Sequence, residues 1–142
     1  MILDLKIPEL PPAGRGAGVV GDVLYGTVSD KRGKTYQTVE AIVELAATRS
    51  DGVRHVVPIP FKLDLRGRKQ LREQLKAWNG GQPLDQFSPE ETWLGKPCWV
   101  EIEIENRIPR VKGFAPNAQS DLKVSTQFVR RSCVAGKEDV AI

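Results

Sequence analysis

Hydrophobic and polar residues alternate with a period of two along residues 36–47 and again along residues 99–105. This period predicts β-strands that bury one face, because successive side chains of a strand point to opposite sides. In the second segment it turns Glu101, Glu103 and Glu105 towards water. Three less regular strands are predicted at 19–25, 53–65 and 108–114.

Turn-forming residues separate these strands. Residues 7–21 are so rich in proline and glycine that we predict an irregular segment there rather than a regular strand. A hairpin loop with three basic side chains is predicted at 29–34, and a second turn at 49–52. Residues 81–92 have the composition of a polar loop.

A helical period marks the middle of the chain. Leu71, Leu75 and Trp78 are spaced by four and three residues, which places them on one stripe of a helix predicted at 66–78. Trp78 is therefore predicted to belong to the core. The glycines at 80–81 end this helix, and basic residues occupy much of its remaining surface.

The order of these elements is strand, strand, strand, helix, strand, strand. It predicts a mainly β protein, a five-stranded OB-fold-like Greek-key barrel with one α-helix between strands 3 and 4. The OB-fold-like domain is predicted to span residues 1–116, including an irregular N-terminal segment rich in proline and glycine. Residues 117–142 are predicted to form a semi-ordered tail, in which 124–129 has the pattern of a short strand.

No run of hydrophobic residues approaches the roughly 18 needed to cross a bilayer, so we expect no membrane association. The N-terminus lacks the charged and apolar regions of a signal peptide. The two cysteines are too few for a disulfide framework. A reduced, cytoplasmic protein is expected.

Candidate catalytic chemistry is sparse. One histidine and two separated cysteines do not form a structural zinc set, and we expect neither a metal nor another cofactor. Cys98 is predicted to be buried and to behave as a small apolar residue. His55 is predicted to be a partly exposed histidine with a structural or binding role. The carboxylates of the strand at 99–105 could suggest a two-metal nuclease, but their spacing of two is typical of a solvated strand face. We therefore predict a protein that is not an enzyme.

Binding chemistry is more evident. The net charge is only +3, but basic residues gather in the loop at 29–34 and in the helix, interleaved with aromatic residues. Such an arrangement suits a nucleic-acid single strand, because cations follow the phosphates while rings stack on bases for about 1–3 kcal/mol each. Two alternatives remain open, namely that Phe61 belongs to the core and that the basic helix is merely solvated. The predicted nucleic-acid contacts are Lys31, Arg32, Lys34, Lys62, Arg66, Arg68, Lys69 and Arg72 for phosphates, and Tyr36 and Phe61 for bases.

Four motifs between residues 10 and 116 resemble phage- and prophage-encoded single-stranded-DNA-binding-like proteins with an OB-like fold. They are Leu10-Pro11-Pro12-Ala13-Gly14 leading to Val20, Phe61-Lys62-Leu63, Leu71-Arg72-x-x-Leu75-x-Ala77-Trp78-x-Gly80, and Gly95-Lys96-x-Cys98-x-Val100.

This resemblance implies largely sequence-independent binding of single-stranded DNA in support of phage replication or recombination, in the cytoplasm of a bacterial host. Replication or recombination enzymes would be its protein partners, and self-association is left open. Two features depart from the resemblance: the outer strand at 99–105 is acidic, and residues 138–142 are only a short counterpart of the acidic tail by which many single-strand binders recruit enzymes. The alternative is a β-barrel module that binds a host or phage protein.

Overall fold

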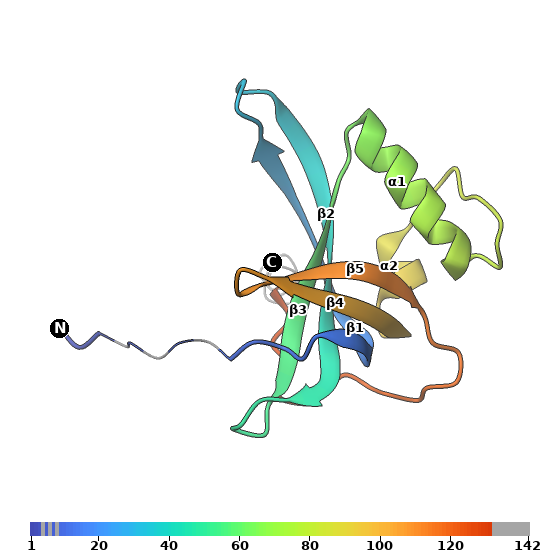
Figure 1. Ribbon diagram of the computed structural model, residues 1–142. Coiled ribbons are helices and arrows are strands. Elements are labelled where there is room, and N and C mark those ends of the chain that lie inside the picture. Colours follow the sequence, from blue (N-terminus) through green and yellow to red (C-terminus); the bar gives the residue numbers. More distant parts are fainter. Residues whose placement is uncertain (4, 6, 8, 132–142) are drawn as a thin grey trace, which may run out of the picture.

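The computed structural model describes residues 1–3, 5, 7 and 9–131 (Figure 1). The prediction for the end of the tail, including residues 138–142, lies outside the described residues. The elements follow one another as β1 (Gly14–Ser29), β2 (Thr35–Thr48), β3 (Arg54–Lys62), α1 (Leu65–Leu75), the 3-10 turn η1 (Lys76–Trp78), α2 (Pro89–Trp93), β4 (Pro97–Glu105) and β5 (Ile108–Pro116).

The five strands form one antiparallel sheet in the order β3-β2-β1-β4-β5. The long strand β1 pairs with β4 through its first residues and with β2 along most of its length. A register shift between Val20 and Asp22 interrupts the pairing with β2. A bulge of this kind bends a strand and increases its twist. In Figure 1, β2 and β3 run at a steep angle to β4 and β5.

The prediction of a mainly β protein with a helix between the third and fourth strands is confirmed. The predicted closure into a barrel is wrong, because β3 and β5 are the two ends of the sheet among the described residues. Prolines explain why these ends stay open. Pro58 and Pro60 lie in β3 and Pro109 lies in β5, and a proline has no N–H with which to extend a sheet at its edge.

The hydrophobic core lies between the sheet and the helices. The predicted inward residues of β2 are buried, with Ala41 and Val43 fully inaccessible, and so are Val100 and Ile102 of β4. The core also contains Trp93 of α2, which is completely buried. The polar loop predicted at 81–92 is therefore wrong at its end, where Ser88 caps a short helix whose first residue is Pro89.

The irregular N-terminal segment is shorter than predicted, because β1 already begins at Gly14. Glycine at position 18 has a steric role there. A Cβ atom on Gly18 would lie 2.7 Å from Cγ1 of Val43 on the neighbouring strand, closer than real Cβ contacts allow. The glycines that suggested an irregular segment thus let two strands approach closely.

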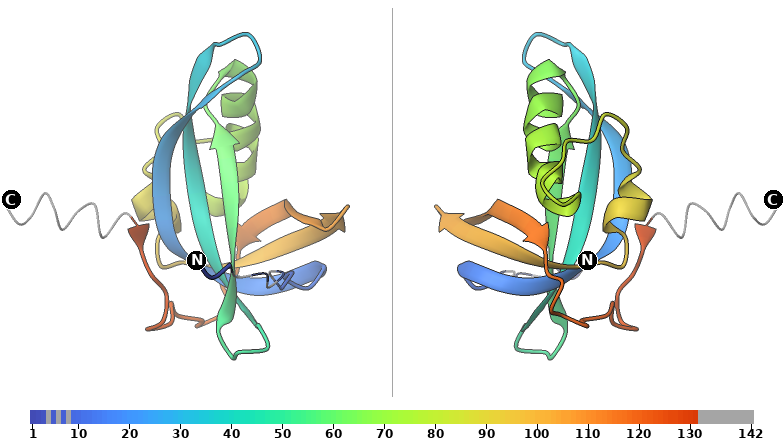
Figure 2. Two further views of the ribbon diagram at one scale, coloured as in Figure 1. Left: turned by 90° about the vertical axis from the view of Figure 1, so that its left-hand side faces the viewer. Right: turned by 90° about the vertical axis from the view of Figure 1, so that its right-hand side faces the viewer.

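The segment 117–131 contacts the sheet through backbone hydrogen bonds from Ser125 and Arg131 (Figure 2). The short strand predicted at 124–129 is wrong, since these residues have no strand hydrogen bonding. Phe128 packs directly on Gly21, where an added Cβ would lie 2.6 Å from its ring. The bulge in β1 and the missing side chain at Gly21 together make room for this ring.

Two single-residue predictions have opposite outcomes. Cys98 is fully buried, as predicted, and burial raises the pKa of its thiol to about 12. His55 is only 6% exposed, so the predicted partial exposure is wrong. It lies at the start of β3, next to Arg54, where the alternation of the strand turns it towards the interior.

Candidate nucleic-acid interface

A lysine and a tyrosine from neighbouring strands meet on the outer face of the sheet. Lys62 of β3 is paired with Thr38 of β2, and the period of two places Tyr36 on the same face. The Nζ atom of Lys62 lies 4.0 Å from the centre of the Tyr36 ring, and Nζ of Lys34 lies 5.5 Å from it. Tyr36 therefore presents a half-buried ring flanked by two ammonium groups.

Asp30 organises the loop between β1 and β2. Its Oδ1 atom accepts hydrogen bonds from the backbone N–H groups of Arg32 and Lys34, both at 2.9 Å, and Tyr36 donates to its Oδ2 atom at 3.4 Å. The bond from Lys34 is the main reason why the pKa of Asp30 is lowered, with the Arg32 and Tyr36 bonds and the charge of Lys62 adding to it. The carboxylate thus shapes a turn whose basic side chains remain exposed.

We call this group the basic tip; it consists of Lys31, Arg32, Lys34, Tyr36 and Lys62. Its loop and the first turn of α1 lie at the same end of the molecule (Figure 1). Asp64, two residues after the last tip residue, caps α1 by accepting a hydrogen bond from Gly67 at 2.7 Å. Arg66 and Arg68 are exposed in this first turn, close in sequence to the tip.

The remaining predicted helix residues lie elsewhere. Gln74 faces the sheet, since its side chain hydrogen-bonds the carbonyl oxygen of Phe114. Arg72 is two residues earlier and is turned away from Gln74 by roughly 200° around the helix. Arg72 forms an ion pair of 2.9 Å with Asp85. Arg72 and Lys69 both line a shallow hollow beside the helix. The structure therefore does not bring Lys69 and Arg72 together with the basic tip.

The ring of Phe61 packs on another aromatic ring instead of standing free on the surface. It is half-buried, and its ring stacks on that of Trp93 with centroids 5.5 Å apart and planes at 29°. Trp78 is likewise packed against the core, 5.0 Å from Phe114, which confirms its predicted place. Among the predicted aromatic contacts, Tyr36 is the one whose ring belongs to the basic tip.

Sequence reasoning missed two basic residues on β5. A cleft of about 400 Å³ lies between the open ends of the sheet, with Pro60 and Phe61 of β3 on one side and Arg110 and Lys112 on the other. Lys62 of the basic tip follows Phe61 directly in β3. A closed barrel would have filled this space with strand pairing, and neither cation is among the contacts predicted from the sequence.

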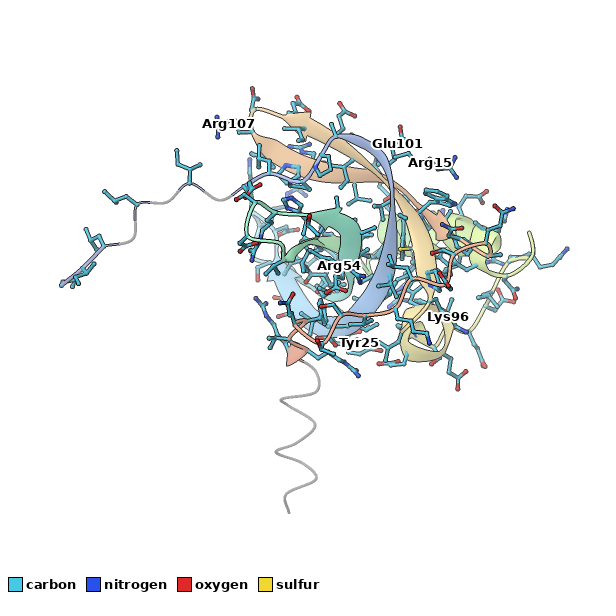
Figure 3. All side chains as sticks on the ribbon, turned by 90° about the horizontal axis from the view of Figure 1, so that it is seen from below. Arg15, Tyr25, Arg54, Lys96, Glu101 and Arg107 are labelled. Carbon is cyan, nitrogen blue, oxygen red and sulfur yellow. The ribbon has the colours of Figure 1, made fainter. Side chains whose placement is uncertain are left out.

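The exposed face of β4, the strand paired with β5, has a different character. The guanidinium of Arg15 lies 4.5 Å from the centre of the Trp99 ring. Trp99 is half-buried, and Arg15 covers part of its ring. Arg15 is also the cross-strand partner of Glu101, and both are labelled in Figure 3. Arg107, in the same figure, is in the tight turn between β4 and β5 with a φ of 63°. The glutamates of β4 are exposed as predicted.

The residues that the structure describes contain no cluster of three or more histidine, cysteine, aspartate or glutamate side chains able to hold a metal ion. None of the described helices is long and apolar enough to cross a membrane. Neither a family model nor a curated protein matches the sequence.

Proposed function

We propose that this protein binds single-stranded DNA largely without regard to sequence and does not act as an enzyme. The observation that carries the proposal is the Tyr36 ring on an open strand face, with the ammonium groups of Lys34 and Lys62 over it. When DNA binds, the lysine side chains turn from the ring to the phosphates, and a base of any identity stacks on the ring in their place.

The surroundings of the tip favour a single strand over a duplex. Near the tip along β3 is the cleft between β3 and β5, which has the proline ring of Pro60 on one wall and Arg110 and Lys112 on the other. Lys112 also lies 4.0 Å from the carboxylate of Glu103. A flexible single strand can follow such a narrow path and expose its bases, whereas the bases of a duplex are stacked inside it. The modest number of cations predicts moderate rather than extreme affinity at physiological salt.

We further propose that the sheet is an open relative of the OB fold. Its first strand pairs with both the second and the fourth, and its helix lies between the third and fourth strands. OB folds bind oligonucleotides on the face of strands 2 and 3 and on the loop joining strands 1 and 2, where the basic tip is located. On this proposal, the cellular role is the protection or presentation of single strands during phage replication or recombination.

A protein-binding module is the second candidate. The observation in its favour is the row of exposed carboxylates at Glu101, Glu103 and Glu105, which would repel phosphate and suit a basic protein surface. The two functions differ in their response to salt and oligonucleotide. Only phosphate binding predicts that the logarithm of the DNA affinity falls linearly with the logarithm of salt concentration.

The deciding experiment is a fluorescence-anisotropy titration of a labelled oligothymidine of roughly 20 nucleotides and of a duplex of equal length. Each is measured at about 50 mM and about 200 mM salt, the range over which phosphate contacts weaken most visibly. We expect salt-sensitive binding with a clear preference for the single strand. Failure of both ligands to bind at the lower salt concentration would refute the proposal and favour the protein-binding module.

A further inference from the structure

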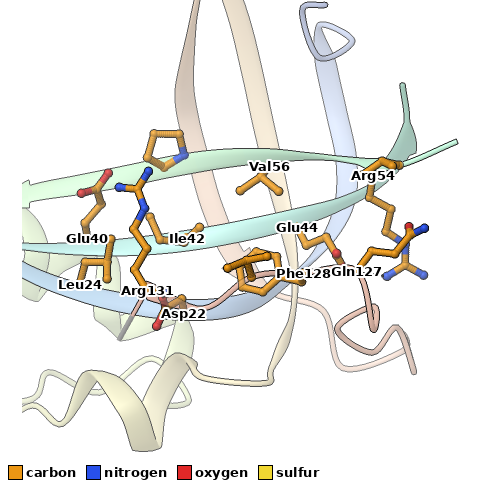
Figure 4. Close-up of a pocket in the computed structure, with 13 residues that line it drawn as sticks. Asp22, Leu24, Glu40, Ile42, Glu44, Arg54, Val56, Gln127, Phe128 and Arg131 are labelled. Atoms are coloured by element: carbon orange, nitrogen blue, oxygen red, sulfur yellow. Dashed lines mark hydrogen bonds and ion pairs between the residues drawn. The ribbon is translucent and has the colours of Figure 1, made fainter. Parts of the chain in front are cut away.

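The outer face that carries Tyr36 extends along the sheet to a second basic segment. Continuing the period of two from Tyr36 places Glu40, Ile42 and Glu44 of β2 on this face. Eight residues separate Tyr36 from Glu44, a distance of roughly 26 Å along a strand. Residues 123–131, which we call the strap, lie against the far end of this face and leave a cleft of about 420 Å³ (Figure 4).

Two buried carboxylates hold the strap. Oε1 of Glu44 accepts a hydrogen bond of 2.8 Å from the backbone N–H of Ser125, and Oδ2 of Asp22 accepts one of 2.8 Å from that of Arg131. Asp22 also pairs with Nε of Arg130 at 3.7 Å. These carboxylate-bearing side chains are 2% and 1% exposed, so the strap removes both from solvent.

Further contacts tie the middle and the start of the strap to the sheet. Arg54 of β3 joins the two parts, because its Nη1 atom donates to Oε1 of Glu44 at 2.9 Å and to the carbonyl oxygen of Lys123 at 2.8 Å. Phe128 fills the space over Gly21. The strap is therefore a specific packed element of the described structure.

The strap makes the charge of this face less negative. Three carboxylates (Asp22, Glu40 and Glu44) and the guanidinium of Arg54 line the part of the cleft that the sheet supplies. The strap covers Asp22 and Glu44 and adds the guanidinium of Arg131 to the lining. Arg131 is exposed, and Figure 4 shows its side chain extending from β1 across β2 towards β3.

We propose that the strap forms the second half of the nucleic-acid site, with Arg131 as a phosphate contact farther along the outer face from the basic tip. This inference rests on the proposed function. A strand leaving Tyr36 along the outer face would meet Arg131 beside Glu40 and Ile42 (Figure 4), and an OB-type site of about 4–16 nucleotides is long enough to include both Tyr36 and Arg131. By covering two carboxylates and adding Arg131, the strap makes this face less repulsive to phosphate.

The test compares full-length variants in the oligothymidine titration. We expect Arg131→Gln to weaken binding about two- to fivefold and to reduce the salt slope by about 0.7, the value for one single-strand phosphate contact. Arg131→Lys should restore most of the slope. Lys96→Gln removes the same charge from an exposed position between α2 and β4 and should leave both quantities unchanged.

A second variant tests the strap itself. Phe128→Ala loosens its packing on Gly21 and should weaken binding at least as much as Arg131→Gln, because Asp22 and Glu44 become accessible to phosphate. Thermal unfolding confirms that each variant is folded at the assay temperature. Unchanged or tighter binding by Arg131→Gln and Phe128→Ala would overturn the inference, tighter binding meaning that the strap blocks the face. If the unaltered protein binds no oligothymidine, the proposed function itself fails.

Discussion

The ammonium group of Lys62 lies 4.0 Å from the centre of the Tyr36 ring, although 26 residues separate the two in sequence. The antiparallel pairing of β2 and β3 creates this contact on the open face of the sheet. A cation–π contact of this kind holds the ring in place and brings positive charge to it. On the proposed function, the Lys62 side chain leaves the ring for a phosphate when a base stacks on Tyr36.

Replacement of Tyr36 tests this role directly. We expect Tyr36→Ala to raise the Kd for single-stranded DNA roughly 5- to 150-fold, corresponding to a loss of about 1–3 kcal/mol of stacking. Tyr36→Phe keeps the ring and should stay close to the unaltered protein. Tyr25→Ala is the matched control, because Tyr25 is bonded to Glu90 of α2 and does not belong to the basic tip. Equal losses for the two alanine variants in the anisotropy titration would contradict a stacking role for Tyr36.

The structure separates the loop cations from the helix cations. The double variant Lys31→Ala/Lys34→Ala should reduce the salt slope of single-strand binding by about 1.4, the value for two phosphate contacts. Lys69→Ala/Arg72→Ala removes the same charge but should reduce the slope by less than half of this, because Arg72 is paired with Asp85 and lies away from the tip. Titrations at four or more salt concentrations measure both slopes. A larger effect of the helix pair would place the DNA on α1 instead.

Two glycines of β1 should respond differently to an added methyl group. Gly18→Ala is expected to lower the free energy of unfolding by about 1–3 kcal/mol, because its Cβ would lie 2.7 Å from Cγ1 of Val43. Gly16→Ala is the matched control on the same strand, since nothing lies within 4 Å of its Cβ, and it should change stability by less than about 0.5 kcal/mol. Urea unfolding followed by tryptophan fluorescence measures both. Similar stabilities of the two variants would show that β1 and β2 are not packed so closely.

Tyr25 connects β1 to α2, and its phenol should lose its proton only at high pH. Burial, followed by the 2.6 Å hydrogen bond to Glu90, raises the pKa of its phenol from 10 to about 12. Between these values the unfolded chain loses the proton first, so this contribution to stability is complete below about pH 10 and disappears as the pH rises towards 12. An absorbance titration of tyrosinate should show a step near pH 12 that is missing in Tyr25→Phe. Persistence of that step in the variant would contradict its assignment to Tyr25.

Part of the candidate site could be predicted from local sequence. The loop cations and Tyr36 were predicted because turn residues and the following alternation place them at a strand end. Phe61, Arg110 and Lys112 could not be assigned in the same way. Whether a ring on a strand packs on Trp93 or meets solvent depends on residues more than thirty positions away.

The sequence by itself determined the elements whose burial pattern repeats locally: strands at 36–47 and 99–105 and the helix at 66–78. A period of two or of 3.6 is a property of neighbouring residues, so it can be recognised without knowing what the buried face contacts. Only the tertiary structure decided that the sheet stays open and that residues 123–131 form a strap. Both depend on contacts between distant segments, at the edges of β3 and β5 and at two buried carboxylates, and these contacts have no periodic sequence pattern.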